Sequence, residues 1–94
     1  MDLSIDYAKT RALGNAIIEK GNDFGTILGK INAENSNLRT YWKGEDASKY
    51  INAVTDQIEN MKTLRASIDE IGQYLIDAAN AYERVNESNL DNFN

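Results

Sequence analysis

The residues of this chain that could do acid–base or metal chemistry are its carboxylates, because its 94 residues include neither histidine nor cysteine. Two pairs of neighbouring acids, Glu45–Asp46 and Asp69–Glu70, are the candidates for a general acid and base. Neighbouring residues on a helix point about 100° apart, so neither pair can face one substrate. The usual ligands of zinc, haem and iron–sulfur clusters are missing, and so is a calcium loop of alternating acids around a glycine. We therefore expect no enzyme activity, catalytic residue, cofactor, metal site or small-molecule ligand.

Composition excludes further classes of function. The net charge is −5, from 15 acids and 10 bases. Phosphate backbones repel an acidic chain, so we expect no nucleic-acid partner. The length allows one domain over residues 1–94, and no stretch is apolar enough to cross a bilayer. The segment from Met1 to Asp6 has neither a basic stretch nor an apolar core, so we expect no cleaved signal peptide.

The spacing of apolar residues predicts one long helix in the second half of the chain. One apolar row recurs every seven positions, and a companion row lies three or four positions further on, over six heptads. The rows are Ala47, Val54, Met61, Ile68, Leu75 and Tyr82, and then Tyr50 or Ile51, Ile58, Leu64, Ile71, Ala78 or Ala79, and Val85. The period of two that is typical of strands is absent. We place this helix at about residues 45–85, followed by an asparagine-rich flexible tail over residues 86–94.

The first half carries a similar but weaker pattern. Ile17, Phe24, Ile31 and Leu38 are seven residues apart, with Leu13, Leu28 and Trp42 on the companion row. No proline interrupts the chain, so we predict an unbroken helix over about residues 5–40. Ser4 is the expected N-cap of this helix, with Asp6 in its first turn.

Residues 41–45 form the predicted turn between the two helices. Gly44 can adopt the left-handed conformation that closes a tight turn. Glu45 and Asp46 then lie at the positive end of the dipole of the second helix. The predicted fold is therefore all-α, an antiparallel hairpin of two long helices.

A hairpin of this kind leaves its apolar stripes incompletely covered, because each stripe is wide enough for more than one neighbour. Packing a second hairpin against the first would give a four-helix bundle, so we expect the chain to dimerise; an element of a larger partner would serve equally well. The expected interface consists of Ile17, Gly21, Phe24, Gly25, Leu28, Ile31, Val54, Ile58, Met61, Ile68 and Leu75. The glycine row Gly21, Gly25 and Gly29 predicts close approach of another helix, the alternative being an exposed row.

Two polar residues interrupt the apolar stripes. Arg65 either extends to solvent and pairs with Asp69, or makes a polar contact that sets the register of the helices. Asn35 occupies a comparable place on the first helix, and its role stays open at this point.

The motif Trp42-Lys43-Gly44, placed between two long helices and followed by Ala47 and Tyr50, resembles the WXG family of small type VII (Esx) secretion proteins, the early-secreted-antigen group. The resemblance implies an antiparallel dimer with four helices, made in the bacterial cytoplasm and secreted without a cleaved signal peptide. The partner would be a second copy or a homologous protein of the WXG or LXG type. Trp42 and Gly44 would belong to a composite signal that the membrane ATPase of the secretion channel recognises.

The family's other signal element, a tyrosine followed four residues later by an acid, is not matched. Tyr82 is followed at that distance by Asn86, with Glu87 one position later. Either Tyr82 and Glu87 form a C-terminal signal at a frayed helix end, or a partner supplies the signal. The function implied is that of a dimeric export substrate or targeting partner for a co-secreted protein. The alternatives are a dedicated partner of the helical N-terminal domain of an LXG-type toxin, and a cytosolic coiled-coil adaptor unrelated to secretion.

Overall fold

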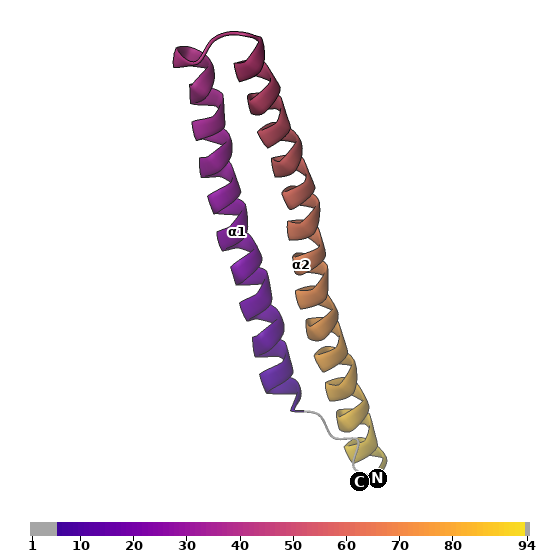
Figure 1. The fold of residues 1–94 in the computed structure, drawn as a ribbon. Coiled ribbons are helices and arrows are strands. Elements are labelled where there is room, and N and C mark those ends of the chain that lie inside the picture. The colour runs from indigo at the N-terminus through magenta and orange to yellow at the C-terminus, as the bar shows by residue number, and fades with distance from the viewer. Residues whose placement is uncertain (1–5, 94) are drawn as a thin grey trace. The chain divides into compact units, whose positions relative to one another are not determined.

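The chain folds into two helices joined by a short loop. The computed structural model describes residues 6–93, with side chains up to residue 87. Helix α1 spans Tyr7–Tyr41 and helix α2 spans Glu45–Phe93 (Figure 1). No strand occurs within residues 6–93, and the predicted all-α fold with two long helices is confirmed.

The start of α1 differs from the prediction. The side-chain Oδ1 of Asp6 accepts a hydrogen bond of 2.9 Å from the Lys9 amide, and its carbonyl oxygen accepts one of 2.9 Å from the Thr10 amide. Asp6 is therefore the N-cap and precedes the first turn, because its side chain satisfies an amide that the helix leaves unpaired. The predicted cap, Ser4, lies outside the described residues.

The end of α2 also differs from the prediction. We expected the helix to end near residue 85, but it continues to Phe93, so residues 86–93 of the predicted tail are helical. Asparagine costs a helix less than about 0.7 kcal/mol per residue, whereas glycine and proline cost more. Neither glycine nor proline follows Gly72, so no strong stop signal precedes the end of the chain.

The chain divides into two units. The turn unit is Gly21–Ser67 and contains the loop; the terminal unit comprises the described parts of Met1–Lys20 and Ile68–Asn94. In each unit a segment of α1 runs antiparallel to a segment of α2 (Figure 1).

In the turn unit, polar contacts between the helices define their register. The Nδ2 of Asn35 donates a 3.1 Å hydrogen bond to the Ile51 carbonyl, and the Nε of Arg65 donates one of 3.0 Å to the Gly21 carbonyl. The residue numbers in each of these pairs add up to 86, so the two helices run in opposite directions with one fixed register.

The seam of the turn unit, where α1 and α2 face each other, holds a small apolar core. Its buried apolar side chains include Leu28, Ile51 and Ile58, and Ala47 is also buried. Leu28 and Ile58 were predicted to contact a second hairpin, but they are only 5% and 4% exposed within this hairpin. They are therefore used by the chain's own core.

In the terminal unit, two glycines allow close approach of the helices. A Cβ atom on Gly14 would lie 2.6 Å from the Gly72 carbonyl oxygen, and one on Gly72 would lie 2.7 Å from the Gly14 carbonyl oxygen. The numbers of this pair again add up to 86. Arg11 contributes an ion pair with Glu83 and a 3.1 Å hydrogen bond to Asn80, neither of which was expected from the sequence.

The predicted glycine row has a mixed outcome. A Cβ on Gly25 would lie 2.7 Å from the Nε of Arg65, so at this position α1 lies close against a side chain of α2. A Cβ on Gly29 would meet no atom within 4 Å, which agrees with the alternative of an exposed position. Gly21 is buried.

Candidate functional site

The loop between the helices is built around Gly44. Its φ of 114° lies in the region that residues with a side chain rarely adopt, which confirms the prediction for this position. Its carbonyl accepts a 3.2 Å hydrogen bond from the Ser48 amide. Glu45 and Asp46 occupy the first turn of α2, where their negative charges interact favourably with the positive end of the helix dipole.

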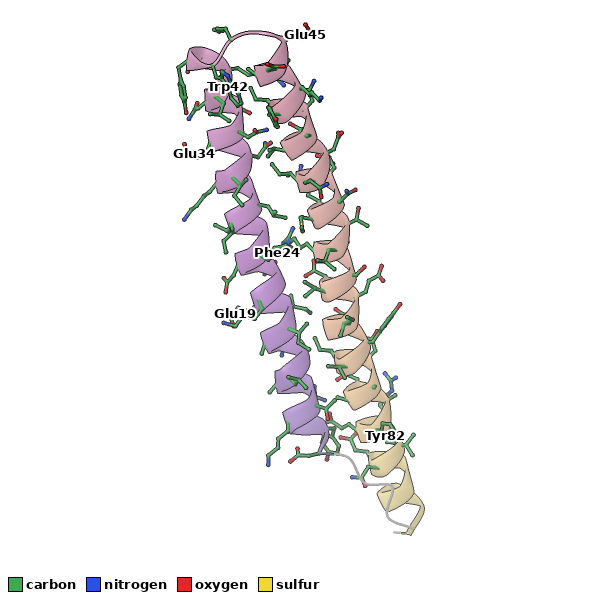
Figure 2. All side chains as sticks on the ribbon, in the orientation of Figure 1. Glu19, Phe24, Glu34, Trp42, Glu45 and Tyr82 are labelled. Carbon is green, nitrogen blue, oxygen red and sulfur yellow. The ribbon has the colours of Figure 1, made fainter. Side chains whose placement is uncertain are left out.

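Trp42 directly follows α1 and is the first residue of the loop that leads to Glu45 (Figure 2). Its amide donates a 2.7 Å hydrogen bond to the Leu38 carbonyl. Its indole ring stacks on the ring of Tyr50, with ring centroids 5.8 Å apart and planes at 16°. The side chain is 40% exposed, so it packs on one side and remains accessible on the other. Nothing in the sequence pattern had predicted this stack.

Two adjoining grooves run along one side of the turn unit. The first has a volume of about 450 Å³ and the second about 350 Å³. The first is lined by Lys30, Ile31, Glu34, Asn35, Leu38, Tyr41 and Val54, and the second by Leu28, Ile31, Tyr50, Ala53, Val54, Gln57, Ile58 and Met61. Ile31 and Val54 line both grooves, so the two form one continuous, mostly apolar surface.

The position of this surface follows from the register of the seam. Residues three positions after a seam residue lie to one side of it, and on antiparallel helices the same offset leads to the same face of the pair. On this face lie Phe24, Ile31 and Leu38 of α1 and Val54 and Met61 of α2, which we call the apolar face. Ile31, Val54 and Met61 are 45%, 37% and 39% exposed. All of the apolar face except Leu38 belongs to the predicted dimer interface.

The opposite side of the turn unit is polar. Residues four positions after a seam residue lie there, and they are Gly25, Asn32 and Arg39 of α1 and Thr55 and Lys62 of α2. Arg39 donates a 3.2 Å hydrogen bond to Asn52. The turn unit therefore has one apolar and one polar face.

The terminal unit repeats part of this arrangement. The predicted interface residues Ile17, Ile68 and Leu75 are half-buried, and Ile71, Tyr74, Tyr82 and Val85 are exposed. Ile17, Leu75 and Tyr82 lie three positions after Gly14, Gly72 and Ala79, which are buried in the seam of this unit.

The predicted C-terminal signal residues, Tyr82 and Glu87, are both exposed on α2. Because α2 is helical through both positions, five residues separate their side chains by about 140° around the helix axis. The first of the two alternatives for a C-terminal signal requires a frayed helix end that brings Glu87 close to Tyr82, and α2 is helical through both positions.

Polar side chains occupy two positions of the seam in the turn unit. Asn35 is 5% exposed; its Nδ2 also donates a 3.1 Å hydrogen bond to the Thr55 hydroxyl, and its Oδ1 is buried without a partner. Arg65 adds a 2.8 Å hydrogen bond from Nη2 to the Asn22 side chain. Of the alternatives for Arg65, the structure shows the polar contact across the seam.

Among residues 6–87, whose side chains the structure describes, no group of three or more acids is placed to hold a metal ion. No helix in this part of the chain is long and apolar enough to span a membrane.

Comparison with protein families identifies the family to which the chain belongs. The family model WXG100, described as proteins of 100 residues with WXG, matches residues 2–87. The chain belongs to this family. The match includes the Trp42-Lys43-Gly44 motif and both helices up to residue 87, so the resemblance seen in the sequence is confirmed. Searches of curated proteins and of solved structures found no significant match.

WXG100 proteins are small helical proteins associated with type VII secretion; they are not enzymes, and they generally form partnered dimers. The chain is accordingly a small type VII secretion-associated protein. Its candidate functional surfaces are the apolar face and the stacked pair of Trp42 and Tyr50, both in the turn unit.

Proposed function

We propose that this WXG100 protein is a dimeric export substrate, or a targeting partner of a co-secreted protein, in a type VII secretion system. A second copy of the chain covers the apolar face. The turn formed by Trp42 and Gly44 stays accessible and is recognised by the membrane ATPase of the secretion channel. The protein leaves the bacterial cytoplasm without cleavage of a signal peptide.

The observation that carries the proposal is the one-sided apolar surface that adjoins an accessible tryptophan. Apolar surfaces of this kind mark sites of protein interaction. Ile31 and Val54 line both grooves, and Trp42 stacks on Tyr50, which lines the second groove. A partner helix that binds in these grooves would therefore lie next to the turn motif on the same surface of the chain.

The balance of buried and exposed apolar side chains supports the need for a partner. Within the described residues the buried apolar set is Leu28, Ala47, Ile51, Ile58 and Ala79. The exposed large apolar residues are Leu13, Ile27, Ile31, Tyr41, Trp42, Tyr50, Val54, Met61, Leu64, Ile71, Tyr74, Tyr82 and Val85. A small single core rarely supplies more than a few kcal/mol of stability, so covering the apolar face would add stability.

The export assay compares the wild-type chain with Trp42→Ala in bacteria with and without the secretion ATPase. Tyr74→Ala is the matched control, because Tyr74 is an exposed aromatic residue of α2 outside the motif. We expect the wild-type chain and the Tyr74→Ala variant in the culture medium only when the ATPase is intact, and Trp42→Ala inside the cells. Circular dichroism of purified Trp42→Ala, with a helical signal like that of the wild type, separates loss of the motif from unfolding.

Export that does not depend on the ATPase, or normal export of Trp42→Ala, would contradict the proposal. A chain that stays inside the cells in every strain would instead favour the adaptor alternative. A monomeric chain that dimerises only with the helical N-terminal domain of an LXG-type toxin would favour the toxin-partner alternative.

A further inference from the structure

We infer that Tyr50 is a positioning residue for Trp42: its ring holds the indole in one half-exposed orientation at the turn. The inference rests on the proposed function, because the orientation matters only if the turn is recognised. It assigns a structural role to Tyr50, which the sequence had marked as part of the apolar stripe and of the resemblance to the WXG family.

The geometry of the pair is that of an offset stack. The ring centroids are 5.8 Å apart and the planes are inclined by 16°. Aromatic pairs favour such offset arrangements at roughly 4.5–7 Å. The contact joins the end of α1 to α2 across the loop, because Trp42 follows the last residue of α1 and Tyr50 lies in α2.

Trp42 needs such a contact because it lies just outside α1, so helical structure precedes it but does not follow it. It lies between Tyr41, where α1 ends, and Gly44, whose φ is 114°. Its amide is bonded to the Leu38 carbonyl, which holds the backbone but leaves the side-chain torsions free. The ring of Tyr50 is the aromatic surface that limits them.

Tyr50 is well placed for this role because it belongs to a well-anchored part of α2. Ala47, one helical turn earlier, is 1% exposed, and Ile51, the next residue, is 2% exposed. Tyr50 also lines the second groove beside Val54. A helix seated in that groove would pack against the same residue, so pairing and presentation of the indole are linked.

The test uses the intrinsic fluorescence of the full chain, because Trp42 is its only tryptophan. Acrylamide quenching measures how accessible the indole is, and the export assay measures recognition. The variants are Tyr50→Ala, which removes the ring, Tyr50→Phe, which keeps it, and the control Tyr74→Ala. Should Tyr50→Ala lose its helical signal, Tyr50→Leu replaces it, because leucine keeps apolar bulk without a ring.

We expect Tyr50→Ala to raise acrylamide quenching and to lower export about 2- to 10-fold, the change that corresponds to loss of a typical aromatic stack. Tyr50→Phe and Tyr74→Ala should match the wild type in both measurements. Unchanged quenching in Tyr50→Ala would overturn the inference. A Tyr50→Phe variant as defective as Tyr50→Ala would also overturn it, because the hydroxyl and not the ring would then matter.

The two proposals fail in different ways. Loss of export in Trp42→Ala together with normal export of Tyr50→Ala would overturn the role of Tyr50 and leave the proposed function intact. Normal export of Trp42→Ala would overturn the proposed function, while the quenching measurement would still decide whether Tyr50 positions the indole.

Discussion

Two glycine-to-alanine substitutions test how closely α1 and α2 approach each other in the terminal unit. A Cβ on Gly72 would lie 2.6 Å from the Cγ1 of Ile18 and 2.7 Å from the carbonyl oxygen of Gly14. The carbonyl is a backbone atom, so it cannot rotate away as a side chain can. Gly29 is the matched control, because a Cβ there would meet nothing within 4 Å.

The expected magnitudes follow from two opposing terms. Either substitution gains about 1 kcal/mol of helix propensity, so Gly29→Ala should raise the free energy of unfolding by about that amount. Gly72→Ala gains the same term but adds overpacking, which costs about 1–3 kcal/mol. The two variants should therefore differ by about 1–3 kcal/mol, with Gly72→Ala the less stable.

The assay is thermal unfolding followed by circular dichroism at one protein concentration, since partner binding makes Tm depend on concentration. A difference of 1 kcal/mol shifts Tm by about 4–8 °C in a domain of this size. Gly72→Ala should therefore unfold at least about 4 °C below Gly29→Ala. A Gly72→Ala variant that unfolds at or above the temperature of Gly29→Ala would refute the close approach of the helices at this pair.

Two further predictions concern the polar residues of the seam. Arg65→Ala should lower the free energy of unfolding in urea by about 1–3 kcal/mol, because it removes two hydrogen bonds from a charged donor to α1; a change below about 0.5 kcal/mol would show that the contact contributes nothing. Asn35→Leu should leave the urea midpoint unchanged or raise it. The substitution loses the two hydrogen bonds of Nδ2, but it also removes the cost of burying Oδ1 without a partner. Asn35→Ala, which leaves a cavity, should be the less stable variant of the two, and the opposite order would contradict this account of Asn35.

The helices and the turn could be predicted from the sequence because their signals are local. A seven-residue spacing of apolar residues predicts helices, and Gly44 is the one position among residues 6–93 where the backbone has a positive φ. The end of α2 could not be predicted in the same way, because asparagine weakens a helix only slightly and the chain has no proline.

The assignment of residues to the seam and to the apolar face was harder to predict. The row with Ile51 and Ile58 and the row with Val54 and Met61 have the same spacing and the same apolar character. Periodicity alone therefore does not show which row faces α1. The structure buries Ile51 and Ile58 in the seam and leaves Val54 and Met61 exposed.

The seam also contains residues that an apolar pattern does not predict. Gly14 and Gly72 permit close backbone approach, and Asn35 and Arg65 make polar contacts between the helices. Each of these depends on the residue that faces it on the other helix, which is distant in the sequence. The only such signal in the sequence is the seven-residue spacing of Gly14, Gly21, Leu28 and Asn35, which indicates that these four residues share one row.

The most direct test of the account is the mass of the chain in solution, measured by light scattering after size-exclusion chromatography for the wild type, Ile31→Glu and Asn32→Glu. Ile31 lies on the apolar face and its neighbour Asn32 on the polar side, so the two variants add the same charge to opposite faces. The 10.5 kDa chain should have a mass of about 21 kDa as wild type and as Asn32→Glu, and about 10.5 kDa as Ile31→Glu. A wild-type chain that stays at about 10.5 kDa at high concentration, or an Ile31→Glu variant that remains dimeric, would contradict pairing through the apolar face.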